Sequence, residues 1–188
     1  QLLGFRKEFP GFKYSISGSA AVINDSVFSM DIVRSGLSLF GASSTNSKRM
    51  KKFKNAVTLC APILQIKKVD KGGGVGYNHK FICQKKTFVA TAKIGYGDGV
   101  NRKLADKSAK VFYDGKAFRL IGKISMDLIC FEIDEELFDF LLKSGLDNQF
   151  VEIINDVQNP NNIANNLGTI PHEVLTSISN RVERVLVD

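Results

Sequence analysis

Hydrophobic residues along the chain gather into short runs that glycine, proline and polar residues separate. After about residue 56 these runs are rich in valine, isoleucine and phenylalanine, which is typical of β-strands. The predicted strands cover residues 57–69, 87–97, 109–124, 128–134 and 150–155. Asp114-Gly115 divides the third run into a β-hairpin, and Pro62 indicates a bulge or an edge position in the first. We therefore expect a mostly-β domain, either a barrel or a sandwich.

Small helices are predicted around the later strands. They cover residues 135–145, 162–168 and 171–180. The first two end at glycine, which favours a helix C-terminus, and the third begins with proline, which suits the first helical position. Residues 181–187 are largely apolar and predict a closing strand.

The first 45 residues have a different pattern. A short extended stretch leads to Ser19, a good N-cap for a helix over residues 19–28. Residues 30–41 begin as a buried strand, turn at Gly36 and can open a helical turn. So short a β/α unit cannot bury a core alone, which indicates the end of a larger parallel α/β structure. Residues 42–55 are polar, basic and without periodicity, and predict a linker and a domain boundary.

The composition is that of an ordinary globular protein. Of 188 residues, 44% are hydrophobic and 24% are charged, and no apolar run approaches the ~20 residues of a membrane span. We therefore expect no membrane partner. Three scattered cysteines argue against a disulfide framework and suit a reducing cytoplasm, and neither the cysteines nor the two histidines have metal-site spacing. No metal site is predicted.

Charge is distributed unevenly. Residues 1–124 hold 23 Lys and Arg against 7 Asp and Glu, whereas residues 125–188 hold 3 against 12. The densest basic run, residues 48–54, is compatible with a nucleic-acid-binding β-domain. No aromatic stacking pattern accompanies it, so a solvated linker is the favoured interpretation and no nucleic-acid partner is expected.

The segment KGGGVGYNHKF, residues 71–81, raises a specific chemical question. Its glycines allow a tight turn or a close approach, and Tyr77 follows them directly. Tyr77 is either an aromatic that packs on a hairpin turn or a hydroxyl that the turn directs at a reaction. This segment alone does not decide between the two.

Taken together, five segments resemble successive signatures of alanine racemases, in the family's order and spacing. They are DIVRSGLSLFG (31–41), AVTLCAPILQIKKVDKGGGVGYNHKF (56–81), TAKIGYGDGVNRKL (91–104), IGKISMDLICFEI (121–133) and GTIPHEVLTSISNRVERV (168–185). The resemblance covers essentially the whole chain. It implies an isomerase of fold type III that uses pyridoxal 5′-phosphate (PLP) to interconvert L-alanine and D-alanine for the peptidoglycan of a bacterial cell wall.

The resemblance also implies how the chain is organised. The family has an N-terminal (β/α)8 barrel that holds PLP and a C-terminal β-domain that completes the site of the other subunit in a head-to-tail homodimer. Residues 1–50 would be the last segment of the barrel plus a basic linker, and residues 51–188 would be the β-domain. The family's PLP lysine motif has no counterpart here, so this chain alone is not expected to bind PLP covalently.

Individual residues receive roles from the resemblance. Racemisation needs two bases on opposite faces of the α-carbon, and Tyr77 matches the family's tyrosine base, the other base being the lysine. Arg34 matches the arginine that hydrogen-bonds the pyridine nitrogen. Ser19, Gly36, Leu37 and His172 match the phosphate-binding positions, and Met126, Asp127 and Tyr96 match substrate-contacting and entrance positions.

Three positions depart from the family pattern. Ser15 stands where a histidine usually supports Arg34, Gly18 replaces an asparagine, and His172 replaces a tyrosine. An alternative hypothesis follows, in which the chain is a non-catalytic remnant or a split half that acts only by assembling with a barrel-bearing chain.

Overall fold

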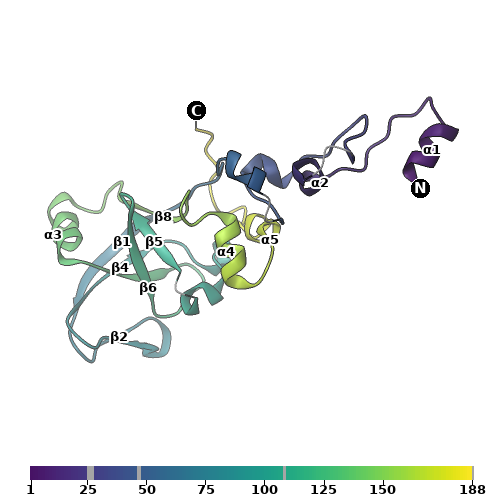
Figure 1. The fold of residues 1–188 in the computed structure, drawn as a ribbon. Coiled ribbons are helices and arrows are strands. Elements are labelled where there is room, and N and C mark those ends of the chain that lie inside the picture. Colours follow the sequence, from purple (N-terminus) through teal and green to yellow (C-terminus); the bar gives the residue numbers. More distant parts are fainter. Residues whose placement is uncertain (25–27, 46–47, 108, 188) are drawn as a thin grey trace. The chain divides into compact units, whose positions relative to one another are not determined.

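The computed structural model describes residues 1–24, 28–45, 48–107 and 109–187, and it divides into two compact units (Figure 1). The first unit is Gln1–Val57 and the second is Thr58–Asp188. The sequence expectation placed the boundary between residues 50 and 51. The polar, basic segment 42–55 thus belongs to the first unit rather than forming a free linker.

A closed antiparallel barrel forms the second unit. In barrel order its strands are β1 (Leu59–Val69), β4 (Thr87–Ala92), β7 (Ile129–Ile133), β6 (Lys116–Ile121), β5 (Lys110–Tyr113) and β8 (Phe150–Ile154). A separate two-stranded ribbon consists of β2 (Gly74–Val75) and β3 (Phe81–Ile82). The expectation of a mostly-β domain is confirmed, and the barrel is the correct one of its two predicted forms.

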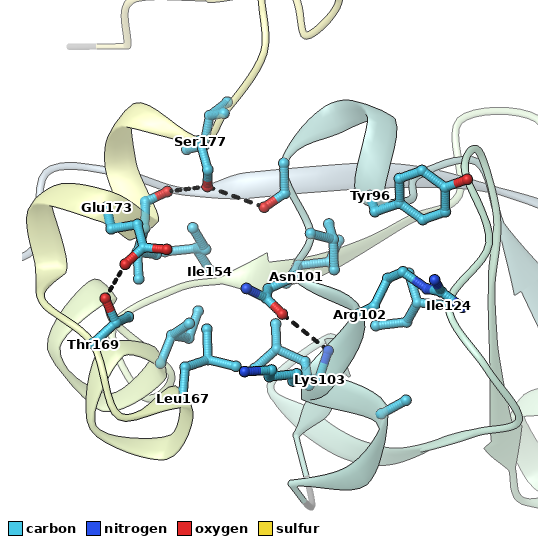
Figure 2. Close-up of a pocket in the computed structure, with 18 of the residues that line it drawn as sticks. Tyr96, Asn101, Arg102, Lys103, Ile124, Ile154, Leu167, Thr169, Glu173 and Ser177 are labelled. Carbon is cyan, nitrogen blue, oxygen red and sulfur yellow. Dashed lines mark hydrogen bonds between the residues drawn. The ribbon is translucent and has the colours of Figure 1, made fainter.

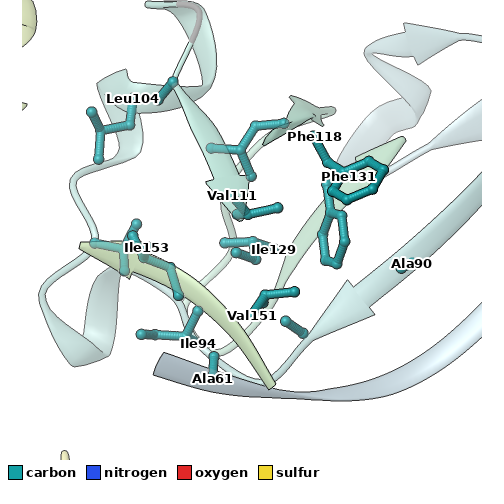
Figure 3. Close-up of a cluster of buried hydrophobic side chains, with 14 of the residues drawn as sticks. Ala61, Ala90, Ile94, Leu104, Val111, Phe118, Ile129, Phe131, Val151 and Ile153 are labelled. Carbon is teal, nitrogen blue, oxygen red and sulfur yellow. The ribbon is translucent and has the colours of Figure 1, made fainter. Parts of the chain in front are cut away.

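Side chains that alternate along the strands fill the barrel (Figure 3). On β7, Ile129, Phe131 and Ile133 are buried, and their alternation with more exposed residues is the period of a half-buried strand. Burial of a side chain of this size stabilises the fold by ~1.5–3 kcal/mol. The apolar runs that predicted the strands are therefore the residues that hold the barrel together.

Two turn features predicted from the sequence are confirmed. Asp114 and Gly115 both have positive φ (46° and 73°), as a two-residue type I′ hairpin requires, and they join β5 to β6. The β1 register shifts between Ile63 and Gln65, directly after Pro62, as β1 leaves β8 and pairs with β4. This irregularity is the predicted bulge.

The helices of the second unit are α3 (Glu135–Ser144), α4 (Pro160–Leu167) and α5 (Pro171–Thr176). The helices α3 and α5 begin at their predicted first residues, and α5 ends at Thr176, earlier than the predicted residue 180. The helix α4 begins earlier than predicted, where Asn159 caps it by accepting from two backbone N–H groups. Short 3-10 turns are η4 (Tyr77–His79), η5 (Tyr96–Asp98) and η6 (Arg102–Asp106). The closing strand predicted at residues 181–187 is wrong, because this segment pairs with no strand in the described part of the chain.

The first unit contains α1 (Leu2–Glu8), α2 (Ser19–Asn24), η2 (Leu37–Phe40) and η3 (Lys48–Lys52). The helix that starts at Ser19 is confirmed, and its predicted continuation over residues 25–27 lies outside the described residues. The predicted strands are wrong: in the described part of this unit their pairing is reduced to a single parallel bridge between Gly18 and Arg34. The helix α1 was not predicted.

Among the described residues, no helix is both long and apolar enough to cross a membrane.

Candidate functional site

In the first unit, backbone and side-chain bonds fix Arg34. Its backbone N–H donates to the Ser17 carbonyl at 2.8 Å. Its guanidinium donates to the carbonyl and hydroxyl oxygens of Ser15 at 3.2 and 3.1 Å, and to the Ile16 carbonyl at 3.3 Å. Ser15, which stands where the family pattern has a histidine, therefore contacts Arg34 through both its backbone and its side chain.

The Ser19 hydroxyl collects donors from the turn that follows Arg34. It accepts from the backbone N–H of Gly36 at 2.9 Å and of Ser38 at 3.3 Å, and the Ser38 hydroxyl lies 3.2 Å away. A Cβ built on Gly36 would meet nothing within 4 Å, so the space beside this turn is open. Because the Ser19 oxygen accepts these bonds, its O–H is left to donate, and a hydroxyl donor beside open space is suited to an anion. Leu37 is buried, so its side chain anchors η2 in this unit.

In the second unit, Tyr77 projects from a strained turn. Gly76, directly before it, has φ 76°, and Asn78 and His79 after it also have positive φ. The His79 ring occupies the space that a Cβ on Gly74 would need, at 2.3–2.6 Å. The Tyr77 side chain is left 69% exposed, so this unit does not use it as a packed aromatic.

The Tyr77 turn lies against the segment that leads to Met126. A Cβ on Gly76 would lie 3.2 Å from the Lys123 nitrogen, and one on Gly122 would lie 3.0 Å from the Val75 carbonyl. Close backbone approach therefore requires glycine on both sides. The structure places the turn of Tyr77 and the start of the Ser-Met-Asp loop side by side.

Tyr96 stands on a second loop that bonds to the same segment. Its N–H donates to the Ser125 carbonyl at 3.0 Å, and the Gly97 N–H donates to the Met126 carbonyl at 2.9 Å. A Cβ on Gly95 would lie 2.3 Å from the Ser125 oxygen. Tyr96 and Met126 both remain exposed, so the two loops present these side chains to solvent at one end of the domain.

A bridge of charges joins these two loops. Asp98 accepts from the Gly95 N–H at 2.9 Å through one oxygen, and its other oxygen lies 3.3 Å from Arg181 Nε. Arg181 also donates through Nη2 to the Asp127 carboxylate. The hydrogen bond to Asp127, and then the charge of Asp98, raise the pKa of Arg181. One carboxylate oxygen of Asp127 is therefore engaged in an ion pair with Arg181.

A cavity of about 590 Å³ lies between η6, α4 and α5, with Tyr96 among its lining residues (Figure 2). Arg102 and Lys123 also line it, and the Arg102 guanidinium lies 5.5 Å from the centre of the Tyr96 ring. Asp106 and Glu173 line the cavity as well, so charges of both signs surround it. His172, on α5, is exposed and is not among the lining residues.

The predicted residues therefore fall into two groups. Ser19, Arg34, Gly36 and Leu37 belong to the first unit, and Tyr77, Tyr96, Met126, Asp127 and His172 belong to the second. The sequence interpretation missed Ser38, Asp98 and Arg181. All three lie inside the segments that carry the resemblance, but their contacts join residues far apart in the chain, which no local pattern reveals.

Comparison with known proteins gives one consistent result. A family model described as alanine racemase, C-terminal domain, matches residues 56–186. The alanine racemase of Rickettsia bellii (strain RML369-C) is 34% identical over 94% of this chain and 42% of its own length. That of Brucella canis is 30% identical over 95% of this chain and 47% of its own length.

Solved structures agree with this result. Alanine racemase from Bartonella henselae with covalently bound pyridoxal phosphate matches 99% of this chain and 51% of that chain, with a TM-score of 0.78 and 30% identity. The Clostridium difficile 630 enzyme in complex with cycloserine matches 96% and 48%, with a TM-score of 0.79 and 31% identity. This chain thus spans about half the length of the relatives that it matches.

Proposed function

Because the chain belongs to the alanine racemase family, we propose that it supplies the C-terminal part of a PLP-dependent enzyme that interconverts L-alanine and D-alanine. The observation that carries the proposal is the exposed Tyr77 on a glycine-rich turn that packs beside the Ser-Met-Asp loop. A structural tyrosine would be packed or hydrogen-bonded within its own domain. One that stands exposed beside substrate-binding loops is suited to proton transfer.

The role of Tyr77 is to carry a proton at one face of the α-carbon. Racemisation removes the α-proton from one side and returns a proton to the other, so one base cannot complete it without changing sides. The close backbone approach of Gly76 and Gly122 positions the turn from which the phenol projects. The opposite base, a lysine, comes from the barrel part of the enzyme.

The loops beside Tyr77 bind and orient the substrate. Met126 offers its backbone N–H to the carboxylate of alanine, and Tyr96 restricts the entrance. Asp127 contributes to this substrate contact, and the bond from Arg181 to one of its carboxylate oxygens orients the loop. The small size of alanine suits an entrance that an aromatic ring narrows.

PLP supplies an electron sink that makes the α-carbon acidic. The residues present fit its phosphate, because the Ser19 O–H can donate to it beside open space, while the N–H groups of Gly36 and Ser38 hold the Ser19 oxygen in place. Arg34 would hold the pyridine nitrogen as a donor, since guanidinium stays protonated and cannot give up its proton to the ring. By the resemblance, His172 would add a donor to the phosphate.

The partners follow from the family. We expect alanine as substrate, a barrel that bears the lysine, and a head-to-tail homodimer in the bacterial cytoplasm, where D-alanine is made for peptidoglycan. No nucleic-acid or membrane partner is proposed. The first unit exposes many large apolar side chains, among them Phe12 and Leu39. Exposed apolar side chains of this kind are expected on a surface that packs against the rest of the barrel in the complete enzyme.

The same exposed surface favours the second candidate function, in which the chain assembles with a barrel-bearing chain but contributes no catalytic group. The two candidates differ in what Tyr77 does. Replacing its hydroxyl therefore separates them.

The test uses the assembled enzyme, in which this chain is supplied with its barrel and PLP. Tyr77→Phe keeps the ring and removes the titratable hydroxyl. We expect exchange of the L-alanine α-proton with solvent deuterium to slow by ~10²–10⁴-fold, with smaller loss from D-alanine. Tyr113→Phe is the matched control, because the Tyr113 hydroxyl bonds Gln149 instead of facing these loops, and it should leave both rates nearly unchanged. Near-normal exchange of the L-alanine α-proton in a folded Tyr77→Phe enzyme would rule out Tyr77 as a base. The second candidate function, assembly with a barrel-bearing chain, would then be favoured.

A further inference from the structure

The segment after α5 is bonded to both loops of the substrate entrance, which we call the Tyr96 loop (residues 95–99) and the Met126 loop (residues 125–127). Arg181 contacts Asp98 on the first and Asp127 on the second. A Cβ on Gly97 would lie 2.5 Å from Arg181 Nη1, so the guanidinium passes close to the Gly97 backbone. One side chain therefore spans the two loops.

The Tyr96 loop is tied to this segment at further points. The Asp98 carbonyl accepts from the Ser179 N–H at 3.1 Å, and the Ser177 hydroxyl donates to the Gly99 carbonyl at 3.2 Å. A Cβ on Gly99 would lie 2.4 Å from the backbone carbonyl oxygen of Ser177. The end of the domain is thus folded back onto the loop that carries Tyr96.

The burial of Asp98 decides how much this ion pair matters. Exposed ion pairs stabilise little, and Arg181 and Asp127 are about half exposed. The Asp98 side chain is only 13% exposed, so loss of its cation would leave a carboxylate with little access to water. Asp98 and Asp127 would also face each other across the loops without a charge between them.

We propose that Arg181 is a positioning residue that sets the separation of Tyr96 and Met126 by holding Asp98 and Asp127 at once. The bearing of this separation on catalysis rests on the proposed function. A guanidinium suits the task because its planar fork donates in two directions, whereas a lysine ammonium acts as a single point charge. The backbone hydrogen bonds between the two loops remain when Arg181 is replaced. Replacement of Arg181 should therefore loosen the two loops without unfolding the barrel.

The first test uses the chain itself and needs no activity. Amide hydrogen exchange is followed at Tyr96 and Gly97, whose N–H groups cross between the loops. In Arg181→Met both should exchange roughly tenfold faster or more, since a charge-assisted hydrogen bond is lost, and Arg181→Lys should lie between Met and the parent. Barrel amides such as that of Ala90 should be unchanged.

Arg184→Met is the matched control, because among the described residues Arg184 donates to the carbonyls of Val182 and Ile178 and not to either loop. It should leave the Tyr96 and Gly97 amides as they are. Unchanged exchange at both amides in Arg181→Met, or equal acceleration across the barrel, would overturn the proposal.

The second test uses the assembled enzyme. Arg181→Met should raise KM for alanine more than it lowers kcat, and Arg181→Lys should recover part of the loss. A fall in kcat at constant KM would contradict a positioning role at the entrance. If the assembled parent enzyme has no racemase activity, the proposed function fails, while the exchange result still decides whether Arg181 holds the loops.

Discussion

At the scale of single residues, glycines determine where the Tyr77 side chain can be placed. Gly72 and Gly76 both have positive φ, a conformation that costs other residues ~1–2 kcal/mol. They differ in their surroundings. A Cβ on Gly72 would meet nothing within 4 Å, whereas one on Gly76 would lie 3.2 Å from the Lys123 nitrogen and 3.5 Å from the Gly122 Cα.

This difference gives a matched pair of substitutions. Gly72→Ala should lower the free energy of unfolding by ~1 kcal/mol, the cost of backbone strain alone. Gly76→Ala should cost at least ~1 kcal/mol more, because the Gly76 backbone (φ 76°, ψ −173°) lies in a region restricted to glycine and backbone atoms of residues 122–123 must also move. Urea unfolding of the two variants measures the difference. Equal losses would mean that the contact between the two turns does not constrain Tyr77.

Residues that act through their own segment could be predicted from the sequence, and residues that act through distant partners could not. Ser19, Gly36 and Tyr77 lie in short motifs whose spacing is visible. Ser38 reaches a hydroxyl 19 positions earlier, and Arg181 reaches a carboxylate 54 positions earlier. Only the fold brings such pairs together.

At the scale of elements, the N-terminus of α3 carries a titratable cap. Asp134 accepts from the Leu137 N–H at 2.9 Å, and its other oxygen lies 2.6 Å from Lys116 Nζ on β6. Burial raises the pKa of Asp134, but the hydrogen bonds from Lys116 and Leu137 outweigh it, so its pKa lies below the usual value. The ionised form is therefore the one that stabilises the fold.

The sign of the pH dependence follows from this depressed pKa. The contribution of Asp134 is complete above the unfolded pKa of ~3.9 and is lost as the pH falls through the lower folded pKa. Asp134→Asn keeps a good cap but loses the ion pair, so it should cost under ~1 kcal/mol at pH 7, because the pair is partly exposed. This cost should shrink at pH 3.

Urea unfolding of the parent and of Asp134→Asn at pH 7 and pH 3 makes the measurement. Asp139→Asn, at an exposed position of the same helix, is the control for a general change in net charge. A cost for Asp134→Asn that is equal at both pH values would show that the Asp134 carboxylate does not contribute through its charge.

Elements of the barrel were predictable because each strand carries its own evidence, in apolar runs and in turn residues such as Asp114-Gly115. The strands expected in residues 30–34 and 181–187 are wrong for a physical reason. A strand needs a neighbour to satisfy its backbone groups, and apolar residues alone do not supply one. Ile32, Val33 and Leu186 are exposed within their units. Conversely, α1 was not predicted, and it buries no side chain within its unit.

At the scale of the whole molecule, the two units differ in how much of their apolar surface they bury. The main hydrophobic cluster, which runs from Leu59 to Val174, belongs entirely to the second unit. The closed barrel there leaves no long strand edge. The first unit buries few large side chains, among them Ile23 and Leu37, and leaves Phe12 70% exposed.

We therefore expect the second unit to fold alone, whereas the first unit needs the barrel part of the enzyme. A chain of residues 58–187 should unfold within about 4 °C of the full chain, the shift that ~1 kcal/mol produces in a domain of this size. Residues 1–57 expressed alone should show no cooperative unfolding, because so little apolar surface cannot offset the entropy of ordering the chain. Circular dichroism measures both transitions. Amide hydrogen exchange in a proven monomer of the full chain can contradict this expectation. Protection of residues 1–50 equal to that of β1 would mean that the first unit is stable without a partner. Its exposed apolar side chains would then no longer indicate packing against the rest of the barrel.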